Sequence, residues 1–240
     1  MRRLAAVTTI EELDRRYYPS YVDEHQRFDA LIRSYLRSDA QVLDAGAGRG
    51  VQFPFDYREH VARMAGVDVD PAVMENPCVT DAAVADMAHL PYPNGEFDLV
   101  FSKYVFEHLT DPLAAMHDLR RVLKPGGHLL IHTPNARHYV ALISRFTPHR
   151  FHVWFMQKRG RAPEDSFRIA YRANTKAALE RLAMRTGFRI VSVDFLETKP
   201  DYLFFSPLAY RAGIAYERLV NRFEVLAPFR VQLIADLEAV

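Results

Sequence analysis

The stretch VLDAGAGRG, residues 42–50, combines a short apolar run, an acid and three glycines at alternate positions. Glycine lets the backbone adopt positive φ angles and approach a ligand closely. In an open parallel sheet, a turn of this kind lies at the carboxyl ends of the strands, where ligands bind. The stretch therefore predicts a ligand-binding turn in an α/β sheet, with Asp44 immediately before it.

Strand-like and helix-like patterns alternate on both sides of this turn. The expected strands cover residues 41–45, 63–69, 79–85, 97–103, 128–133 and 188–196, with a last one near residues 231–237. The expected helices follow Gly50 and cover residues 111–123, 174–186 and much of 202–223. Strands that alternate with helices favour a parallel sheet. We therefore expect a Rossmann-like, doubly wound α/β fold with a mostly parallel seven-stranded sheet.

The composition excludes several other classes of protein. The formal net charge is +1, which gives no overall attraction to nucleic acid or to an anionic membrane. The single cysteine, Cys78, cannot form an internal disulfide and suits a reducing compartment. No apolar run approaches the length of a transmembrane helix, and the first residues lack a signal-peptide pattern. We expect a cytoplasmic protein without a transmembrane segment.

Two kinds of cofactor turn compete for residues 42–50. A dinucleotide fingerprint has the spacing GxGxxG, whereas Gly46, Gly48 and Gly50 give GxGxG. The spacing therefore disfavours a nicotinamide dinucleotide. Asp44 is placed to pair with the positively charged amino acid end of a zwitterionic cofactor.

The turn resembles motif I of class I S-adenosylmethionine (SAM)-dependent methyltransferases, and later segments resemble the UbiE-like branch of this family. These segments are GVDVD (66–70), ADM with HLPYP (85–93), FDLVFS (97–102), EHL (107–109) and the stretch from Leu119 to Gly127. Each motif is weak alone, but their common order and spacing make the resemblance specific. It covers about 95 residues, from Val42 onward.

The resemblance implies SAM as the cofactor. Asp44 would bind its amino group, Asp68 its two ribose hydroxyls and Asp86 the amino group of its adenine. The other residues predicted to contact the cofactor are Gly46, Ala47, Gly48, Gly50, Val69, Met87, Ser102 and Tyr104. Met87 would lie against the adenine ring.

The whole chain is then expected to form one class I methyltransferase domain. Residues 1–38 would be an N-terminal helical cover, and 39–134 the SAM-binding half. Residues 135–173 would be an insertion on the substrate side, after the fifth strand. Residues 174–240 would supply the C-terminal helix and strand elements. A chain of 240 residues suits a single core.

Methyl transfer asks little chemistry of the protein, because the sulfonium methyl group is already electrophilic. The protein must align the acceptor and exclude water. A hydroxyl acceptor also benefits from a general base. His108 and His138 are the candidate catalytic residues, although each would equally fit a structural role, while His132 is expected to pack in the sheet. We predict no metal, because no carboxylate cluster remains beyond those assigned to SAM.

The insertion gives the main information on the acceptor. Its basic residues could bind a phosphate or carboxylate, and its aromatic residues could cover sugar rings, although solvated surface is the commoner explanation. The basic residues are Arg145, Arg150, Lys158, Arg159, Arg161, Arg168 and Arg172, and the aromatic ones are Phe151, Trp154, Phe155 and Phe167. His149 and His152 in the same segment have no assigned role.

We therefore predict methyl transfer to a hydroxyl of a small molecule, which is a sugar, a glycan precursor or a secondary metabolite and is anionic or glycan-linked. The alternatives are N- or C-methylation of an amino sugar or quinone-like acceptor, and a SAM-binding protein without catalysis. We expect no nucleic-acid partner, because no appended binding module is present. The protein is expected to be a monomer or a homodimer. The apolar segment 202–210 would dock on the sheet, contact a second copy or touch a membrane.

Overall fold

The computed structural model describes residues 9–51, 56–146 and 169–240. In these ranges, seven strands form one sheet in the order β3-β2-β1-β4-β5-β7-β6. Six strands run in one direction, and β7 runs antiparallel to both of its neighbours, β5 and β6. This arrangement confirms the predicted Rossmann-like, mostly parallel sheet. The strands are β1 (Gln41–Ala45), β2 (Arg63–Asp68), β3 (Asp81–Val84), β4 (Phe97–Lys103), β5 (Leu123–Pro134), β6 (Phe188–Leu196) and β7 (Gln232–Ala239).

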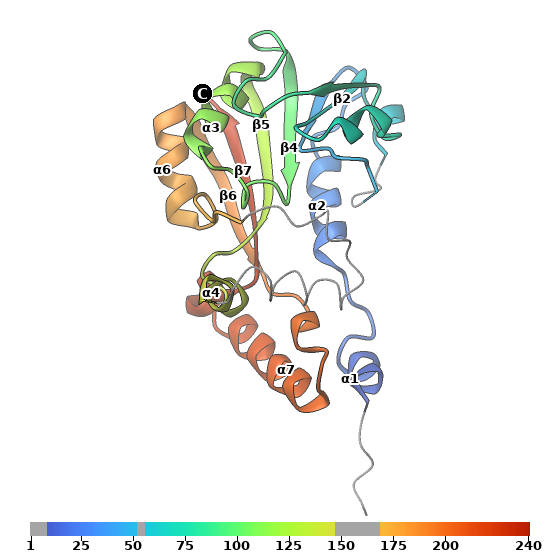
Figure 1. Cartoon of the computed structure of the whole chain (residues 1–240), viewed down its shortest axis with the longest axis vertical. Coiled ribbons are helices and arrows are strands. Elements are labelled where there is room, and N and C mark those ends of the chain that lie inside the picture. The colour runs from blue at the N-terminus through green and yellow to red at the C-terminus, as the bar shows by residue number, and fades with distance from the viewer. Residues whose placement is uncertain (1–8, 52–55, 147–168) are drawn as a thin grey trace, which may run out of the picture.

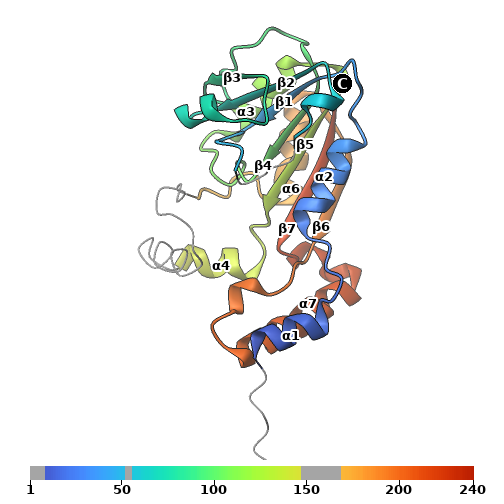
Figure 2. The ribbon, with the colours of Figure 1, turned by 90° about the vertical axis from the view of Figure 1, so that its right-hand side faces the viewer.

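Helices cover both faces of the sheet and one of its ends. Figure 1 shows α3 and α6 on one face and α2 on the other, while Figure 2 shows α1, α4 and α7 gathered beyond the carboxyl ends of β4 and β5. The helices are α1 (Ile10–Tyr17), α2 (Glu24–Arg33), α3 (Pro112–Val122), α4 (Tyr139–Phe146), α6 (Lys176–Thr186) and α7 (Pro207–Arg222). Short 3-10 helices are η1 (Arg58–His60), η2 (Pro71–Glu75), η4 (Asp201–Leu203) and η5 (Glu224–Phe229).

Local sequence signals set several helix ends. Asp23 and Asp111 cap α2 and α3, since each side chain accepts a hydrogen bond from a backbone N–H of the first turn. Thr175 caps α6 in the same way, and Gly187 ends it with a left-handed φ of 77°. The predicted helix over residues 174–186 is thus confirmed as α6.

The sheet has a separate apolar layer on each face. On one face, α3 and α6 bury Met116, Leu119 and Leu182 against the strands. On the other, Phe28 and Ile32 of α2 are fully buried over β1 and β4. These two layers stabilise the sheet and leave its carboxyl edge as the place where polar side chains gather.

The N-terminal helical cover is divided between two places. Helix α2 packs on the sheet, but α1 packs on α7, where Leu13 contacts Tyr210 and Ile214. The predicted helix within residues 202–223 is confirmed as α7. No helix in the described ranges is long and apolar enough to cross a membrane.

Two predicted elements differ from the structure. The sequence predicted a helix after Gly50. The described residues there contain the short 3-10 helix η1, and residues 52–55 lie outside the described ranges. Pro54 in that stretch disfavours a helix interior. Strand β5 starts at Leu123, five residues earlier than predicted, because residues 125–127 form an irregularity within its pairing to β4.

Candidate active site

Polar side chains from several distant segments meet at the carboxyl edge of the sheet. The glycine turn follows β1, Asp68 ends β2 and Asp86 follows β3. Residues 104–108 follow β4, His138 follows β5 and Glu197 follows β6. The doubly wound topology brings these strand ends to one edge, so residues assigned to different parts of SAM lie on the same side of the molecule.

The glycine turn is packed too tightly for side chains at two of its positions. Gly46 has a φ of 92°, and a Cβ atom there would lie 2.1 Å from Cγ2 of Val105. Gly50 has a φ of 74°, and its Cβ would lie 2.3 Å from Oδ1 of Asn76. The Asn76 amide also donates to the carbonyls of Ala47 and Gly48, at 3.1 and 3.2 Å. The turn is thus held closely between β2 and the segment after β4.

Gly46→Ala should therefore lower the free energy of unfolding by about 3 kcal/mol, because alanine is strained at a positive φ and its Cβ would overlap Val105. Gly95→Ala is the matched control, because Gly95 also has a positive φ of 64° but its Cβ would meet nothing within 4 Å. Adding Val105→Ala to Gly46→Ala should restore part of the loss in thermal unfolding. Equal destabilisation by the two glycine substitutions would contradict this account.

Asp68 links the turn to the end of β2. Its Oδ2 accepts a hydrogen bond from the Gly48 N–H at 2.9 Å, and its Oδ1 accepts one from Asp70 N–H at 2.9 Å. Each carboxylate oxygen has a second lone pair, so Asp68 retains the capacity to bind two ribose hydroxyls. Val69, beside it, is 58% exposed.

Asp44 has the electrostatics of a site for a cation. Burial raises its pKa to about 8, and repulsion from Asp68 acts in the same direction, while Lys103 lowers it. An ammonium group beside Asp44 would favour the ionised carboxylate and offset both unfavourable effects. The residues present therefore fit the amino acid end of SAM.

The pKa of Asp44 predicts a pH dependence of SAM binding. Below pH 8 the free protein holds a proton on Asp44 that an incoming ammonium must displace, so affinity should rise almost tenfold per pH unit from pH 6 to 7. Above about pH 8 the α-amino group of SAM loses its own proton. Affinity should therefore be greatest near pH 8. Calorimetry in buffers of different ionisation enthalpy would detect the released proton, and a flat profile between pH 6 and 7 would contradict the assignment.

Asp86 and Met87, the two residues after β3 that were predicted to contact the cofactor, differ in their exposure. Asp86 is exposed, and its Oδ1 accepts a hydrogen bond from Ala88 N–H at 2.8 Å. Met87 is only 6% exposed and packs in the main core. The exposed carboxylate suits a ligand, whereas the role of Met87 beside adenine stays a prediction.

The end of β4 contains residues with distinct environments. Ser102 is fully buried and donates to the Ala45 carbonyl at 2.7 Å, so its hydroxyl stabilises the pairing of β1 with β4. Tyr104 has a φ of 58°, uncommon outside glycine. Its ring lies 4.8 Å from that of His132, which is fully buried as predicted for a strand histidine. Direct contacts of Ser102 and Tyr104 with SAM stay predictions.

Three residues beside this strand end were not predicted from the sequence. Lys103 contacts His25 of α2, and burial lowers its pKa to about 8. Glu24 accepts a hydrogen bond from the Tyr104 hydroxyl at 3.3 Å. Helix α2 reaches the strand end only through tertiary packing, so spacing in the sequence carried no signal for this group.

His108 lies in a turn that packs against the glycine turn. Its N–H donates to the carbonyl of Val105, the residue that would collide with a side chain at position 46. Its Nε2 is 4.0 Å from Oε1 of Glu107, and the two side chains are 27% and 6% exposed. A partly exposed imidazole with a buried carboxylate beside it is suited to accept a proton.

Glu107 is held in place by a buried polar network. It accepts a hydrogen bond from the Thr133 hydroxyl at 3.0 Å, and that hydroxyl accepts one from the Asn174 amide at 2.5 Å. Burial raises the pKa of Glu107 to about 7. The EHL motif contained Glu107, but the burial of its carboxyl group and its contact with Thr133 became visible only in the structure.

His138 occupies a closed environment. It is 2% exposed, its Nδ1 accepts from Val140 N–H at 3.4 Å, and its Nε2 is 3.7 Å from Oε1 of Glu197. Its ring lies 4.1 Å from that of Tyr139. Burial lowers the pKa of His138 to about 3, so its imidazole is a weak proton acceptor near neutral pH.

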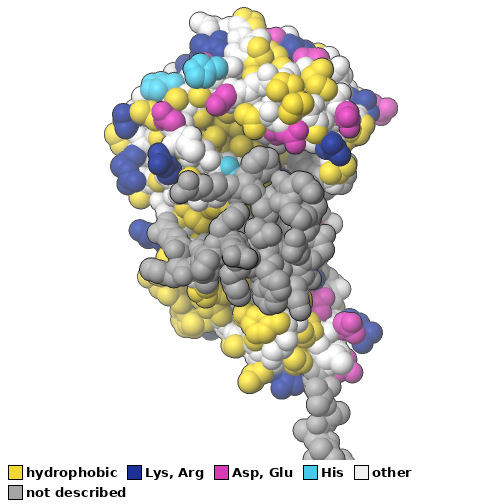
Figure 3. Space-filling model, viewed as in Figure 1, with side chains coloured by type: hydrophobic (Ala, Val, Ile, Leu, Met, Phe, Trp, Pro, Cys, Tyr) yellow, Lys and Arg dark blue, Asp and Glu magenta, His cyan; other side chains and the backbone are white. Residues whose placement is uncertain are grey.

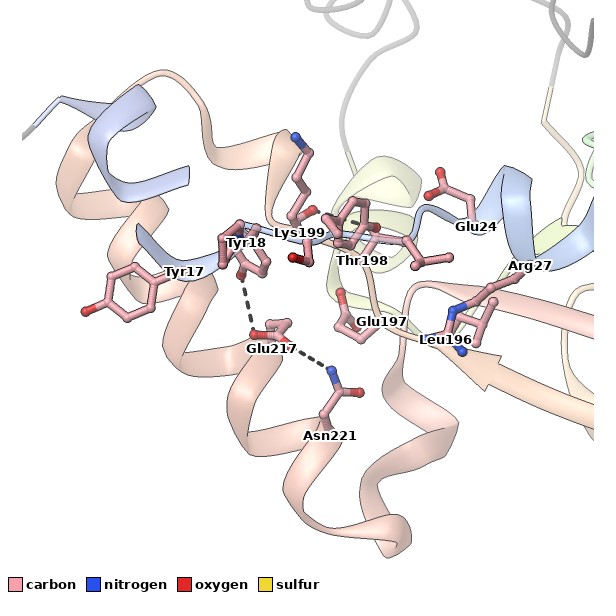
Figure 4. Close-up of a pocket in the computed structure, with 14 residues that line it drawn as sticks. Tyr17, Tyr18, Glu24, Arg27, Leu196, Glu197, Thr198, Lys199, Glu217 and Asn221 are labelled. Atoms are coloured by element: carbon pink, nitrogen blue, oxygen red, sulfur yellow. Dashed lines mark hydrogen bonds between the residues drawn. The ribbon is translucent and has the colours of Figure 1, made fainter. Parts of the chain in front are cut away.

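A cavity of about 380 Å³ lies between the α1–α2 connection, the end of β6 and α7. Figure 4 shows Tyr18, Glu197 and Glu217 on its walls. Glu217 accepts hydrogen bonds from the Tyr18 hydroxyl at 3.4 Å and from the Asn221 amide at 2.7 Å. Glu24 also lines the cavity, so the cavity adjoins Tyr104 at the end of β4.

Most of the predicted acceptor-binding residues lie outside the described residues. This applies to the side chains of Arg145, Arg150, Lys158, Arg159, Arg161, Arg168, Phe151, Trp154, Phe155, Phe167, His149 and His152. Arg172 is described and donates to the Thr110 carbonyl. Within the described ranges, no group of three or more His, Cys, Asp or Glu side chains could hold a metal ion.

A profile of the methyltransferase domain family matches residues 13–193. A probable SAM-dependent methyltransferase from Mycolicibacterium smegmatis is 31% identical over 205 residues, which cover 83% of this chain and 70% of that protein. The chain belongs to the SAM-dependent methyltransferase family. The cofactor of this methyltransferase is therefore SAM, which confirms what its ordered motifs implied.

One further relative of the methyltransferase and one solved structure of similar fold have names that specify different acceptors. The quinone C-methyltransferase UbiE of Cupriavidus pinatubonensis is 28% identical over 116 residues, or 42% of this chain and 46% of that enzyme. The structure of geranyl diphosphate C-methyltransferase from Streptomyces coelicolor has a TM-score of 0.55 and 16% identity, and covers 90% of this chain and 81% of that one. That structure contains S-adenosylhomocysteine. The likeness concerns the fold, which does not decide the acceptor.

Proposed function

We propose that this methyltransferase methylates a hydroxyl group of a small molecule, namely a sugar, a glycan precursor or a secondary metabolite. The observation that carries the proposal is the position of His108, which is partly exposed beside the glycine turn and has the buried Glu107 carboxylate 4.0 Å from its ring. Hydroxyl groups need to lose a proton during methylation, and an imidazole beside a carboxylate is suited to take it.

In this mechanism, Asp44 binds the amino group of the cofactor and Asp68 its ribose hydroxyls, while the exposed Asp86 receives the adenine. Bound SAM supplies an electrophilic methyl group. His108 accepts the proton from the acceptor hydroxyl, and Glu107 stabilises the resulting imidazolium. His138 is not assigned as the base, because its burial and low pKa disfavour proton uptake.

The cavity in Figure 4 provides the acceptor side of the proposed site. Tyr18 and Tyr21 give it aromatic surface, while Glu24, Glu197 and Glu217 offer carboxylates. Pockets for small molecules combine apolar walls with a few placed polar groups. Hydroxyl groups of a sugar can donate to such carboxylates, so this lining supports a polyhydroxylated acceptor. Arg27 and Lys199 line the same cavity, so its charges are mixed and do not select between a neutral and an anionic acceptor.

A labelled-methyl transfer assay tests the proposal. The purified protein is incubated with methyl-labelled SAM and with glycan, lipid and metabolite fractions, and the labelled product is identified by mass spectrometry and NMR. We expect a methyl ether. Label on carbon would instead support the second candidate, C-methylation, which the UbiE relative favours. Label on nitrogen would likewise contradict the proposal, and SAM binding without any labelled product would support a non-catalytic protein.

We further propose that the chain forms a single methyltransferase domain, with residues 135–173 on the substrate side. Helix α4 lies in this segment and places Tyr139 against Tyr216 of α7, at a ring distance of 5.0 Å. This contact supports a position beyond the carboxyl edge. A cytoplasmic location, a monomeric or homodimeric state and the absence of a nucleic-acid partner stay predictions.

A further inference from the structure

Helix α7 presents two chemically different faces. Its inner face buries Tyr210, Ile214 and Val220. The same side of the helix directs Glu217, whose side chain is 14% exposed, toward the cavity. Among the described residues, Arg218 of the outer face contacts the end of α1 by donating to the Tyr17 carbonyl at 3.4 Å, but most of that face is exposed and its composition has to be explained separately.

The outer face carries an apolar stripe. Leu208, Ala212, Ala215 and Leu219 are exposed and follow one another at helical spacings of four, three and four residues, and Phe223 continues the row after the helix. Leu208 is 77% exposed, Leu219 50% and Phe223 52%. Figure 3 shows hydrophobic side chains gathered in the region where Figure 1 places α7.

Neighbouring residues at both ends of α7 extend this surface. Phe205 precedes the helix and is 66% exposed, while Val225 and Phe229 of η5 are 81% and 45% exposed. Single exposed apolar residues are ordinary, but a contiguous group of large ones marks an interaction surface. We refer to the exposed residues of segments 205–223 and 225–229 as the α7 surface.

Basic side chains border the apolar stripe. Arg211, Arg218 and Arg222 are exposed and lie along one side of it, at spacings of seven and four residues. Glu217 faces the cavity and pairs with Arg218 at 3.4 Å, which offsets the charge of this arginine, while Glu224 pairs with Arg230 at 2.8 Å. The α7 surface thus combines exposed apolar area with a row of cations.

We propose that the α7 surface binds peripherally to an anionic lipid membrane. Helices that lie in the membrane interface insert their apolar side chains and place Lys or Arg near lipid phosphates. An antiparallel contact between two copies of the stripe is disfavoured, because it would bring the arginines of the two copies to the same side. An anionic surface neutralises that row, so charge complementarity selects lipid over a second copy.

The position of α7 gives this contact a functional consequence. One side of α7 lines the cavity through Glu217 and Asn221, and the opposite side carries the stripe. A helix is about 10 Å across. Binding to the membrane therefore holds the proposed acceptor cavity close to the lipid surface, where an acceptor attached to a lipid could be reached.

Vesicle flotation tests the proposal with the purified full chain. We expect binding to vesicles of phosphatidylcholine mixed with phosphatidylserine, weakened by salt, and little binding to phosphatidylcholine alone. Arg211→Glu with Arg222→Glu should reduce binding at least about tenfold. Leu208→Ser with Leu219→Ser should do the same through loss of inserted apolar area. Circular dichroism and SAM affinity should not change in either variant, which separates this test from that of the methyl transfer.

Helix α6 offers a matched control. Met184 is 81% exposed there and lies between the exposed Arg181 and Arg185, while Leu179 and Leu182 of the same helix are buried. Met184→Ser and the Arg181→Glu, Arg185→Glu pair should leave vesicle binding unchanged. Absence of binding to anionic vesicles, or equal losses in the α6 variants, would overturn the proposal. So would a dimer in light scattering that dissociates in the Leu208→Ser, Leu219→Ser variant without any vesicle binding.

Discussion

Replacing His108 by alanine is expected to lower kcat for methyl transfer about a thousandfold, within the usual contribution of general base catalysis. The imidazole is 27% exposed beside the glycine turn, where it can reach an acceptor hydroxyl. The affinity for SAM should change little, because the proposed cofactor contacts come from other residues. Rates with the acceptor found in the labelling assay, together with calorimetric SAM titrations, would check both expectations.

Two variants sharpen this test. His117→Ala removes an exposed histidine from α3 and should leave kcat unchanged. Glu107→Gln keeps an oxygen for the Thr133 hydroxyl but removes a carboxyl group 4.0 Å from the His108 ring. Because the pKa of Glu107 is about 7, this group is ionised at pH 8, where the substitution should lower kcat about tenfold. The acid limb of the kcat profile should also move to lower pH, a change that loss of structure alone would not produce. Unchanged O-methylation by His108→Ala would refute the assigned base.

Asp44→Asn is expected to weaken SAM binding about a hundredfold at pH 8, because the substitution removes a charged hydrogen-bond acceptor and turns an amide toward the ammonium group. The fold should survive. Burial raises the pKa of this carboxyl to about 8, so the folded protein keeps a proton on Asp44 that the unfolded chain releases at lower pH, and the resulting loss of stability grows as pH rises toward 8. A neutral asparagine removes that cost, and Tm at pH 8 should not fall.

The control for this effect is Asp70→Asn. Asp70 is exposed two residues after Asp68, and its Oδ1 accepts a hydrogen bond from Ala72 N–H that asparagine can also accept. The control removes the same charge close to the turn without touching the proposed ammonium site. SAM affinity in Asp70→Asn should stay within a fewfold of the wild type. Equal affinities of Asp44→Asn and wild type would remove Asp44 from the cofactor site.

The cofactor half of the site was predictable because its signals are local. Gly46 and Gly50 are needed for a backbone path that other residues would block, and Asp68 lies at the end of a short strand whose hydrophobic pattern is contiguous. The catalytic and acceptor half of the site was not predictable from such local signals. Glu107 lies in the turn after β4, and its raised pKa comes from burial, while the Thr133 hydroxyl of β5 acts in the opposite direction. No periodicity in the sequence reports these contacts.

The sequence by itself determined the doubly wound sheet, the glycine turn and the identity of the methyl donor, because turn conformation and the alternation of strands with helices depend on residues close together in the chain. Tertiary structure alone decided which histidine stays accessible. His108 and His138 look alike in the sequence, yet one is 27% exposed and the other is enclosed at 2% beside Glu197. Solvent access and charge at a site depend on contacts between distant segments, and only the folded chain creates them.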